Sequence, residues 1–105
     1  MLDFVVTILY NVATDEFFVF RRMTRKDKLL KRFLENPLSL KYSGIESILL
    51  DFGFTKKQGK GSHVKFRHLL LNLNVIIPLH HNDCKPHYKI SVAKILKDNN
   101  FSYEA

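Results

Sequence analysis

Residues 43–54 read SGIESILLDFGF, and this stretch decides more of the fold than any other. Ser43 and Glu46 have the spacing of a capping box, in which each side chain binds an unpaired backbone amide at a helix start. Apolar residues then recur on one helical face: Ile45, Ile48, Leu49 and Phe52. Gly53 supplies the left-handed residue that ends a helix, so Phe54 can fold back onto the last turn. The stretch predicts a helix with one face in the core.

A second helix is predicted before this one. Thr24 can cap it, because its hydroxyl accepts from the backbone while Asp27 lies in the positive first turn. Four apolar residues follow at helical spacing: Leu29, Leu30, Phe33 and Leu34. Pro37 disfavours helix at Asn36 and is expected to end the element there.

A third helix is predicted near the C-terminus. Pro86 suits a first helical turn, where its missing amide costs nothing. The apolar stripe is Tyr88, Val92, Ile95 and Leu96, and Asn99 with Asn100 closes the helix. Three lysines are expected on the solvated face: Lys89, Lys94 and Lys97.

Three strands are predicted between the second and third helices, beginning with Thr55–Gln58. Residues 63–70 alternate, with Val64 and Phe66 on one side and the polar His63, Lys65 and Arg67 on the other. Residues 74–79 alternate too. The two glycines of residues 56–61 could approach a phosphate, but their spacing is not that of a P-loop, which favours a plain hairpin turn. His68 falls on the apolar side and is expected to be buried and hydrogen-bonded.

The register between the last two strands depends on where the turn lies. A two-residue turn at Leu71-Asn72 would place Phe66 opposite Ile77, and His63 opposite His80. Moving the turn to residues 72–74 shifts the pairing by two residues but preserves the faces. We therefore expect four residues to share the polar face: His63, Lys65, Arg67 and His80.

The first 22 residues differ in composition from the rest. Two short strands, Phe4–Tyr10 and Phe17–Phe20, are predicted there, and the apolar runs are too short to span a membrane. Met23 looks like a natural start. We predict a working domain at 23–105, and two interpretations of residues 1–22 stay open: a pair of strands that belongs to the protein, or an apolar extension outside this domain.

Charge and cysteine content narrow the function. The chain of 105 residues is 46% hydrophobic and carries a formal charge of +7, which suits one folded domain that attracts polyanions. No acidic side chain occurs between Asp51 and Asp83, so an anionic ligand is expected in that window. The lone Cys84 permits no internal disulfide, which fits a reducing cytoplasm.

Residues 61–68, GSHVKFRH, resemble the HicA family of toxin ribonucleases. Residues 49–54 (LLDFGF) resemble the end of that family's first core helix, and residues 75–80 (VIIPLH) its third strand. Lys85-Pro86 before an apolar helix resembles its closing element, and the resemblance covers roughly residues 24–98. The sequence departs from the pattern of that family in two places, the leucine-rich turn at 69–74 and the apolar start before Met23.

The resemblance implies an α+β fold, a small α-β-β-β-α arrangement similar to double-stranded-RNA-binding domains, here with an added amino-terminal helix. It implies an mRNA interferase that cleaves single-stranded mRNA in the cytoplasm, away from membranes, and is neutralised by a HicB-type antitoxin. The family's catalytic histidine maps onto His63, where an imidazole can accept or give a proton near neutrality. We expect four cations to bind RNA phosphates, with His80 as a weaker second group: Lys57, Lys60, Lys65 and Arg67.

Three alternatives compete with this interpretation. His80, His81, Cys84 and His87 fall within eight residues, but they lack the paired spacing of a zinc site, so we expect no metal and no cofactor. The same fold could serve as a non-catalytic RNA-binding module, which would tolerate loss of His63. It could also be a protein-interaction domain whose charge meets an acidic partner.

Overall fold

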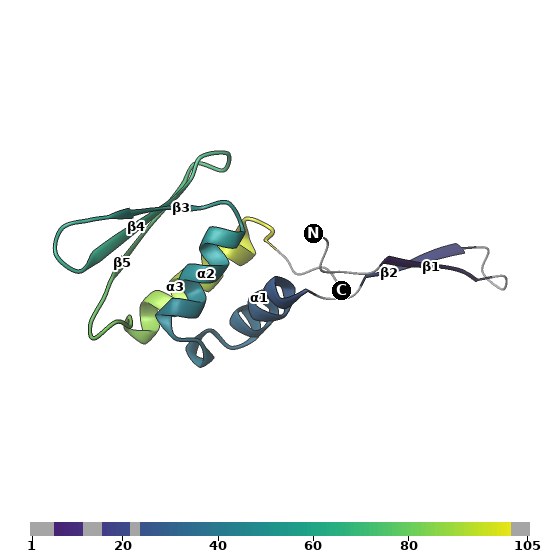
Figure 1. Cartoon of the computed structure of the whole chain (residues 1–105), viewed down its shortest axis with the longest axis horizontal. Helices are drawn as coiled ribbons and strands as arrows, with labels where there is room; N and C mark the ends of the chain where they lie inside the picture. Colours follow the sequence, from purple (N-terminus) through teal and green to yellow (C-terminus); the bar gives the residue numbers. More distant parts are fainter. Residues whose placement is uncertain (1–5, 12–15, 22–23, 102–105) are drawn as a thin grey trace.

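The computed structural model describes residues 6–11, 16–21 and 24–101 of the chain. Its elements, labelled in Figure 1, are β1 (Val6–Asn11), β2 (Glu16–Arg21), α1 (Arg25–Glu35), the short 3-10 helix η1 (Pro37–Ser39), α2 (Tyr42–Asp51), β3 (Thr55–Gln58), β4 (His63–His68), β5 (Leu73–Pro78) and α3 (Pro86–Asp98). The α+β class is confirmed. So is the α-β-β-β-α order from α2 to α3, with α1 as the added amino-terminal helix.

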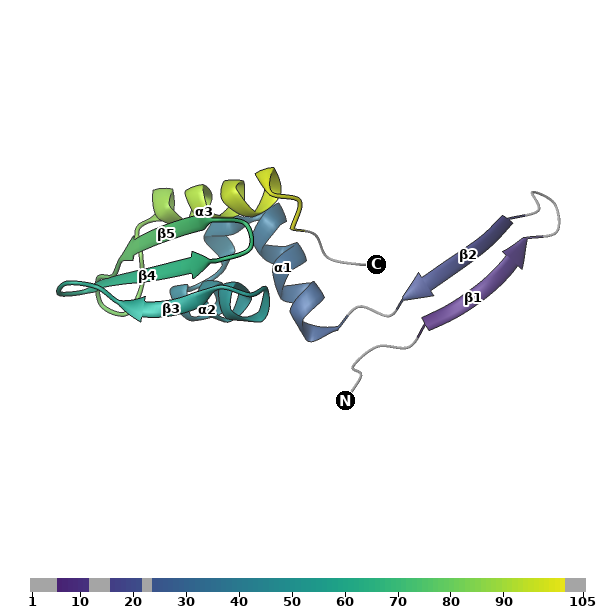
Figure 2. The same ribbon diagram turned by 90° about the horizontal axis from the view of Figure 1, so that it is seen from above.

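The three-stranded antiparallel sheet has the order β3-β4-β5. Its helices lie on one side and leave the other face open (Figures 1 and 2). Four strand side chains fill the core beneath the sheet: Val64, Phe66, Val75 and Ile77. This is the alternation that the sequence predicts.

The predicted register of β4 and β5 is wrong by two residues. Phe66 lies opposite Val75 and His63 opposite Pro78, so the turn is centred on Leu70 and Leu71. The turn closes where the Asn72 amide donates to the Leu69 carbonyl over 3.3 Å, with Asn72 at a φ of 51°. A shift of two residues keeps every side chain on its face, so the predicted polar face survives in β4.

The predicted cap of α1 is confirmed. The Asp27 amide donates to the Thr24 hydroxyl over 3.2 Å, and the Thr24 amide donates to the Asp27 carboxylate over 3.1 Å. Leu30 and Phe33 are fully buried, and the helix ends at Glu35, immediately before Asn36-Pro37.

The start of α2 differs from the prediction, whereas its end agrees. The helix begins at Tyr42 and has no side-chain cap, so the predicted Ser43 capping box is wrong. The Tyr42 amide instead donates over 2.9 Å to the carboxylate of Asp83, a residue far away in sequence. At the other end Gly53 has a φ of +97°, and the Phe54 amide donates to the Leu49 carbonyl over 2.9 Å.

Lys89 of α3 also departs from the prediction. It is buried, and its ammonium donates to the Leu40 carbonyl over 2.7 Å. Its long side chain reaches this partner across the helical layer, which a helical wheel does not reveal. Lys94 and Lys97 are exposed, as predicted, and α3 ends before Asn99.

The two predicted N-terminal strands are present with shifted bounds, as the antiparallel pair β1 and β2, from Val6 opposite Arg21 to Asn11 opposite Glu16. Figure 1 shows this hairpin apart from the helices and the three-stranded sheet. Phe4, residues 12–15 between the two strands and Met23 lie outside the described residues. No helix in the described part of the chain is long and apolar enough to cross a membrane.

Candidate active site on the open face of the sheet

Four of the predicted site residues lie together on the open face. His63, Lys65 and Arg67 are exposed along β4, while the residues between them are buried. The register places Lys57 of β3 beside Lys65, so three strongly basic side chains accompany the histidine. Among the described residues, no carboxylate pairs with Lys57, Lys65 or Arg67, whereas Lys56 pairs with Glu46. A face with this charge attracts polyanions.

The His63 ring is oriented by the turn that precedes β4. Its Nδ1 lies 3.0 Å from the carbonyl oxygen of Lys60. A carbonyl oxygen only accepts hydrogen bonds, so Nδ1 must carry the proton that it donates. In the neutral ring Nε2 is therefore the nitrogen with a free lone pair, and the residue is exposed to solvent. This arrangement leaves Nε2 able to take a proton from a bound molecule.

Gly59 and Gln58 complete this turn through contacts with His63 that the sequence did not reveal. Gly59 lies opposite His63 and donates its amide to the His63 carbonyl over 2.8 Å. A Cβ at Gly59 would lie 3.1 Å from that carbonyl oxygen and 3.3 Å from the His63 Cβ, which is closer than most real contacts. Gln58 donates its side-chain amide to the same carbonyl over 3.1 Å and to that of Gly61 over 3.2 Å. The segment is a braced hairpin turn, as predicted.

Arg67 is held by two asparagines that sequence reasoning also missed. Its Nη1 donates to the side chain of Asn74 over 2.9 Å, and its Nη2 donates to that of Asn72 over 3.2 Å. Both partners are neutral, so neither of them offsets the charge of the guanidinium. Its remaining N–H groups can bind a phosphate in a defined plane.

His80 and Lys60 lie at the same end of the sheet as His63. Lys60 is exposed in the turn before β4. His80 follows the end of β5, so the predicted pairing of His80 with His63 is wrong. The Leu79 amide still donates to the Ser62 carbonyl over 3.0 Å, which keeps this segment beside the turn. His80 then forms a bridge with Asp83 across a turn.

That second turn is strained and anchored. His81 and Asn82 both have left-handed backbones, with φ of 52° and 64°, which non-glycine residues rarely adopt. The Asp83 carboxylate anchors the turn, because it accepts the amides of Tyr42 over 2.9 Å and Cys84 over 2.8 Å. Lys89 lies 3.3 Å from the same carboxylate. Without the Asp83 carboxylate, the strained backbone of His81 and Asn82 would relax and His80 would move.

These contacts change the acidity of the two neighbouring groups. Partial burial alone would raise the pKa of Asp83, but its hydrogen bonds from Cys84 and Tyr42 and the Lys89 ammonium outweigh this and lower it. Burial raises the pKa of the Cys84 thiol, which therefore stays protonated. His68 is likewise buried, and its Nδ1 accepts the Leu71 amide over 3.2 Å, as predicted.

A further property of the described residues bears on metal chemistry. Nowhere among them do three or more His, Cys, Asp or Glu side chains come together in a way that could hold a metal ion. The three histidines of the His80–His87 segment lie on the surface, whereas Cys84 is buried.

The comparisons with known proteins agree with this geometry. A family model described as the HicA toxin of bacterial toxin-antitoxin matches residues 42–100, more than half of the chain. No curated protein and no solved structure gives a significant match. The matched span runs from the start of α2 through the whole sheet to the end of α3, and it includes the entire open face. The chain therefore belongs to the HicA toxin family.

Proposed function

We propose that this toxin is an endoribonuclease, an mRNA interferase that cleaves single-stranded mRNA by metal-independent general acid/base catalysis at His63. One observation carries the proposal. The Lys60 carbonyl engages Nδ1 of His63 and so leaves Nε2 as a base on an exposed basic face. Membership of a toxin family supports the same conclusion.

The proposed reaction uses the substrate's own hydroxyl as the nucleophile. Nε2 of His63 takes the proton of a ribose 2′-hydroxyl, and the 2′-oxygen attacks the adjacent phosphorus. The bond from phosphorus to the 5′-oxygen breaks, and that oxygen takes a proton as it leaves. The products are a 2′,3′-cyclic phosphate and a 5′-hydroxyl end. A well-placed general base typically contributes about 10²–10⁴-fold to such a rate.

The neighbouring cations have distinct proposed roles. Lys65 is two residues along β4 from His63, about 7 Å at the usual strand rise. It is therefore near enough to stabilise the charge that develops on the attacked phosphate. Arg67 lies two residues beyond Lys65 on the same face of β4 and would bind the next phosphate. Lys57 and Lys60 would guide the flanking backbone, and His80 would donate the proton to the leaving oxygen.

A HicB-type antitoxin is the proposed protein partner. An inhibitor must cover the His63 face to stop cleavage. The cations there have no carboxylate partner within the described part of the chain, which favours an acidic surface on that inhibitor. We place the reaction in the cytoplasm, where mRNA is available and where a lone buried thiol such as Cys84 stays reduced.

The nature of the RNA ends tests this function. The purified chain, separated from any antitoxin, is incubated with a defined single-stranded RNA and excess chelator, and the fragments are weighed by mass spectrometry. Cyclic phosphate and 5′-hydroxyl ends are expected. Linear 5′-phosphate ends would contradict attack by the 2′-hydroxyl. A protein that binds the RNA and leaves it intact would instead be the non-catalytic RNA-binding module.

A further inference from the structure

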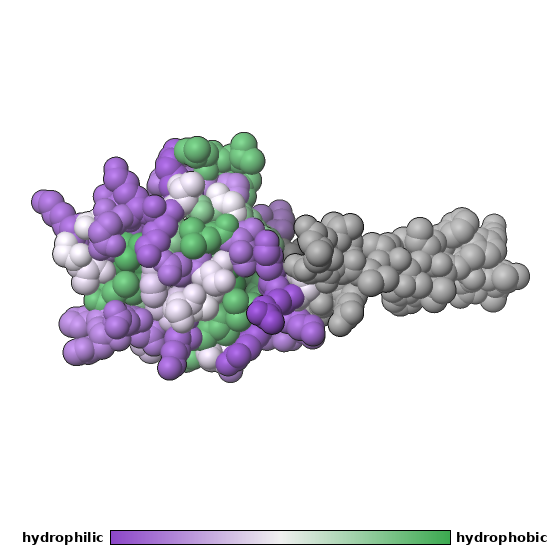
Figure 3. All heavy atoms as spheres, viewed as in Figure 1, coloured by the Kyte–Doolittle hydropathy of each residue, from purple (hydrophilic) through white to green (hydrophobic). Residues whose placement is uncertain are grey.

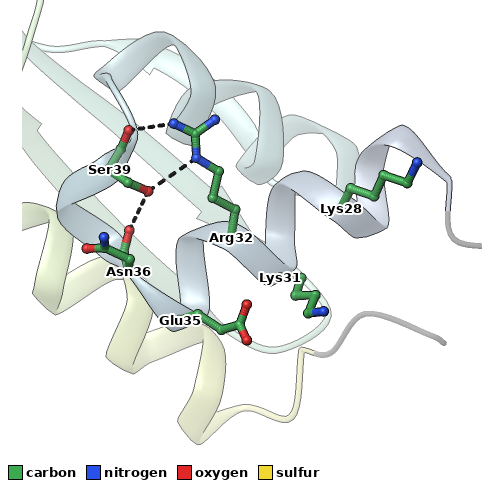
Figure 4. A pocket seen from close by; sticks show the side chains of 6 residues that line it. All are labelled: Lys28, Lys31, Arg32, Glu35, Asn36 and Ser39. Carbon is green, nitrogen blue, oxygen red and sulfur yellow. Dashed lines mark hydrogen bonds between the residues drawn. The ribbon is translucent and has the colours of Figure 1, made fainter.

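A second basic surface lies on α1, outside the residues that the family model matches. This helix packs against α2 and α3, and Figures 1 and 2 show it away from the strands. Its outer side borders an open hollow of about 470 Å³. Six residues line this α1 hollow, drawn in Figure 4: Lys28, Lys31, Arg32, Glu35, Asn36 and Ser39.

The helix geometry gathers these cations on one side. Asp27, Leu30 and Phe33 are buried against the body, so positions 28, 31, 32 and 35 fall on the opposite side at spacings of three and four. Three cations therefore face the α1 hollow together with a single carboxylate, that of Glu35. The local charge balance is positive, although this helix is not part of the proposed active site.

Arg32 is already oriented toward the hollow. Its Nε donates to the Ser39 hydroxyl over 3.3 Å, and its Nη2 donates to the Ser39 carbonyl over 3.1 Å. The Ser39 hydroxyl in turn donates to the Asn36 carbonyl over 2.7 Å. A guanidinium has five N–H groups, so most of those on Arg32 remain available to a ligand. The two hydrogen bonds to Ser39 fix the plane of the guanidinium.

The chemistry of the lining selects an anion with several oxygen acceptors. Ammonium and guanidinium groups only donate hydrogen bonds, and the planar fork of Arg32 matches a phosphate. The α1 hollow is open rather than enclosed, which suits a phosphate within an extended RNA chain better than a small molecule that must be enclosed. We propose that it binds a backbone phosphate of the same single-stranded RNA, outside the segment cleaved at His63. This inference rests on the RNA substrate of the proposed function.

The test compares two charge reversals of equal size in a His63→Ala background, so that the RNA stays intact. One variant is Lys28→Glu with Lys31→Glu. The matched control is Lys94→Glu with Lys97→Glu on the exposed side of α3. Binding is measured against salt with a labelled RNA of about four nucleotides, at the low end of single-strand site sizes, and with one several times longer.

We expect the α1 variant to bind the longer RNA about tenfold more weakly than the control. Its slope of log affinity against log salt should be smaller than that of the control by about 0.7, the value for one phosphate contact on a single strand. The short RNA should bind both variants alike, because it occupies the sheet alone. Equal binding of the longer RNA by the two variants would overturn the proposal.

Two additional arms separate the other outcomes. Inorganic phosphate alone is titrated against both variants, and phosphate binding that only the α1 variant loses, with equal affinity of the two variants for the longer RNA, would identify a free-phosphate site and overturn the strand proposal. If the glutamate variant does not fold, Lys28→Gln with Lys31→Gln gives the same comparison with a smaller charge change.

Cleavage by the chain with His63 intact is measured separately. A chain that cuts no RNA, yet loses affinity through the α1 variant, would contradict the nuclease and still support the α1 site.

Discussion

The ammonium of Lys89 lies 2.7 Å from the carbonyl oxygen of Leu40 and 3.3 Å from the carboxylate of Asp83. These contacts join the segment before α2 to the loop after β5. Asp83 also accepts the first amide of α2, so one hydrogen-bonded network joins the helical layer to the turn that carries His80. The proposed active-site end of the sheet thus depends on residues outside the proposed catalytic and phosphate-binding set.

Lys89→Ala is predicted to lower the free energy of unfolding by about 2–3 kcal/mol. The change leaves the Leu40 carbonyl without its donor and removes a charge-assisted contact from Asp83. Urea denaturation measures the loss. The control is Lys94→Ala, whose exposed ion pair with Asp98 spans one helical turn and should be worth at most about 0.5 kcal/mol. Equal losses in the two variants would contradict a structural role for Lys89.

The stability of the fold is predicted to fall in acid through Asp83. Folding lowers the pKa of this carboxyl below its ordinary value of 3.8. The resulting stabilisation is complete above about pH 5 and is lost as the pH falls through the folded-state pKa. Asp83→Asn removes the titrating group, so its unfolding midpoint should change less than that of the wild type below about pH 4. Parallel pH profiles of the two proteins would refute this.

Gly59→Ala is predicted to reduce cleavage more than it reduces stability. The new methyl group would press on the carbonyl and Cβ of His63 and displace the ring. Small displacements of a catalytic group can cost up to about 10²-fold in rate. Cleavage rates and melting temperatures of the variant are measured together. Full activity in a folded variant would show that the close approach of the two strands is unimportant.

Leu70→Asn is predicted to leave stability within about 0.5 kcal/mol of the wild type. Leu69 and Leu70 of the β4–β5 turn are 69% and 92% exposed, so they contribute little to the core. Figure 3 shows the hydrophobic surface that gathers over this turn. The substitution should also reduce self-association, measured by sedimentation, because exposed apolar patches promote it. A clearly destabilised variant would mean that the turn packs against something in solution.

Features set by neighbouring residues could be predicted from the sequence. The cap formed by Thr24 and Asp27 and the end of α2 at Gly53 each involve partners a few residues apart. The alternation in β4 placed His63, Lys65 and Arg67 on one face because the period of a strand is two. The most important part of the candidate site therefore followed from local pattern.

Features that depend on residues far apart in the sequence could not be predicted from it. The start of α2 is determined by Asp83, 41 residues away, which no local capping pattern reveals. Lys89 is buried by a contact with a residue 49 positions earlier. The leucine-rich turn has no glycine to mark its centre, so the sequence did not determine the register of β4 and β5, and the prediction was wrong by two residues. As a result His80 lies in a turn after β5 and not opposite His63.

The boundary predicted at residue 23 remains a prediction. A chain that begins at Met23 should unfold at the same temperature as the full chain, because the described β1–β2 hairpin lies apart from the body in Figure 1. Differential scanning fluorimetry on the two proteins makes the comparison. A large drop on truncation would assign residues 1–22 to the working domain.

The most direct test of the central claim compares the wild type with His63→Ala, each free of antitoxin, on a defined single-stranded RNA in excess chelator. The account predicts cleavage by the wild type, a rate about 10²–10⁴-fold lower in the variant, and similar RNA affinity in both. Equal cleavage by the two proteins would contradict catalysis by His63, and so would intact RNA with salt-sensitive binding by both.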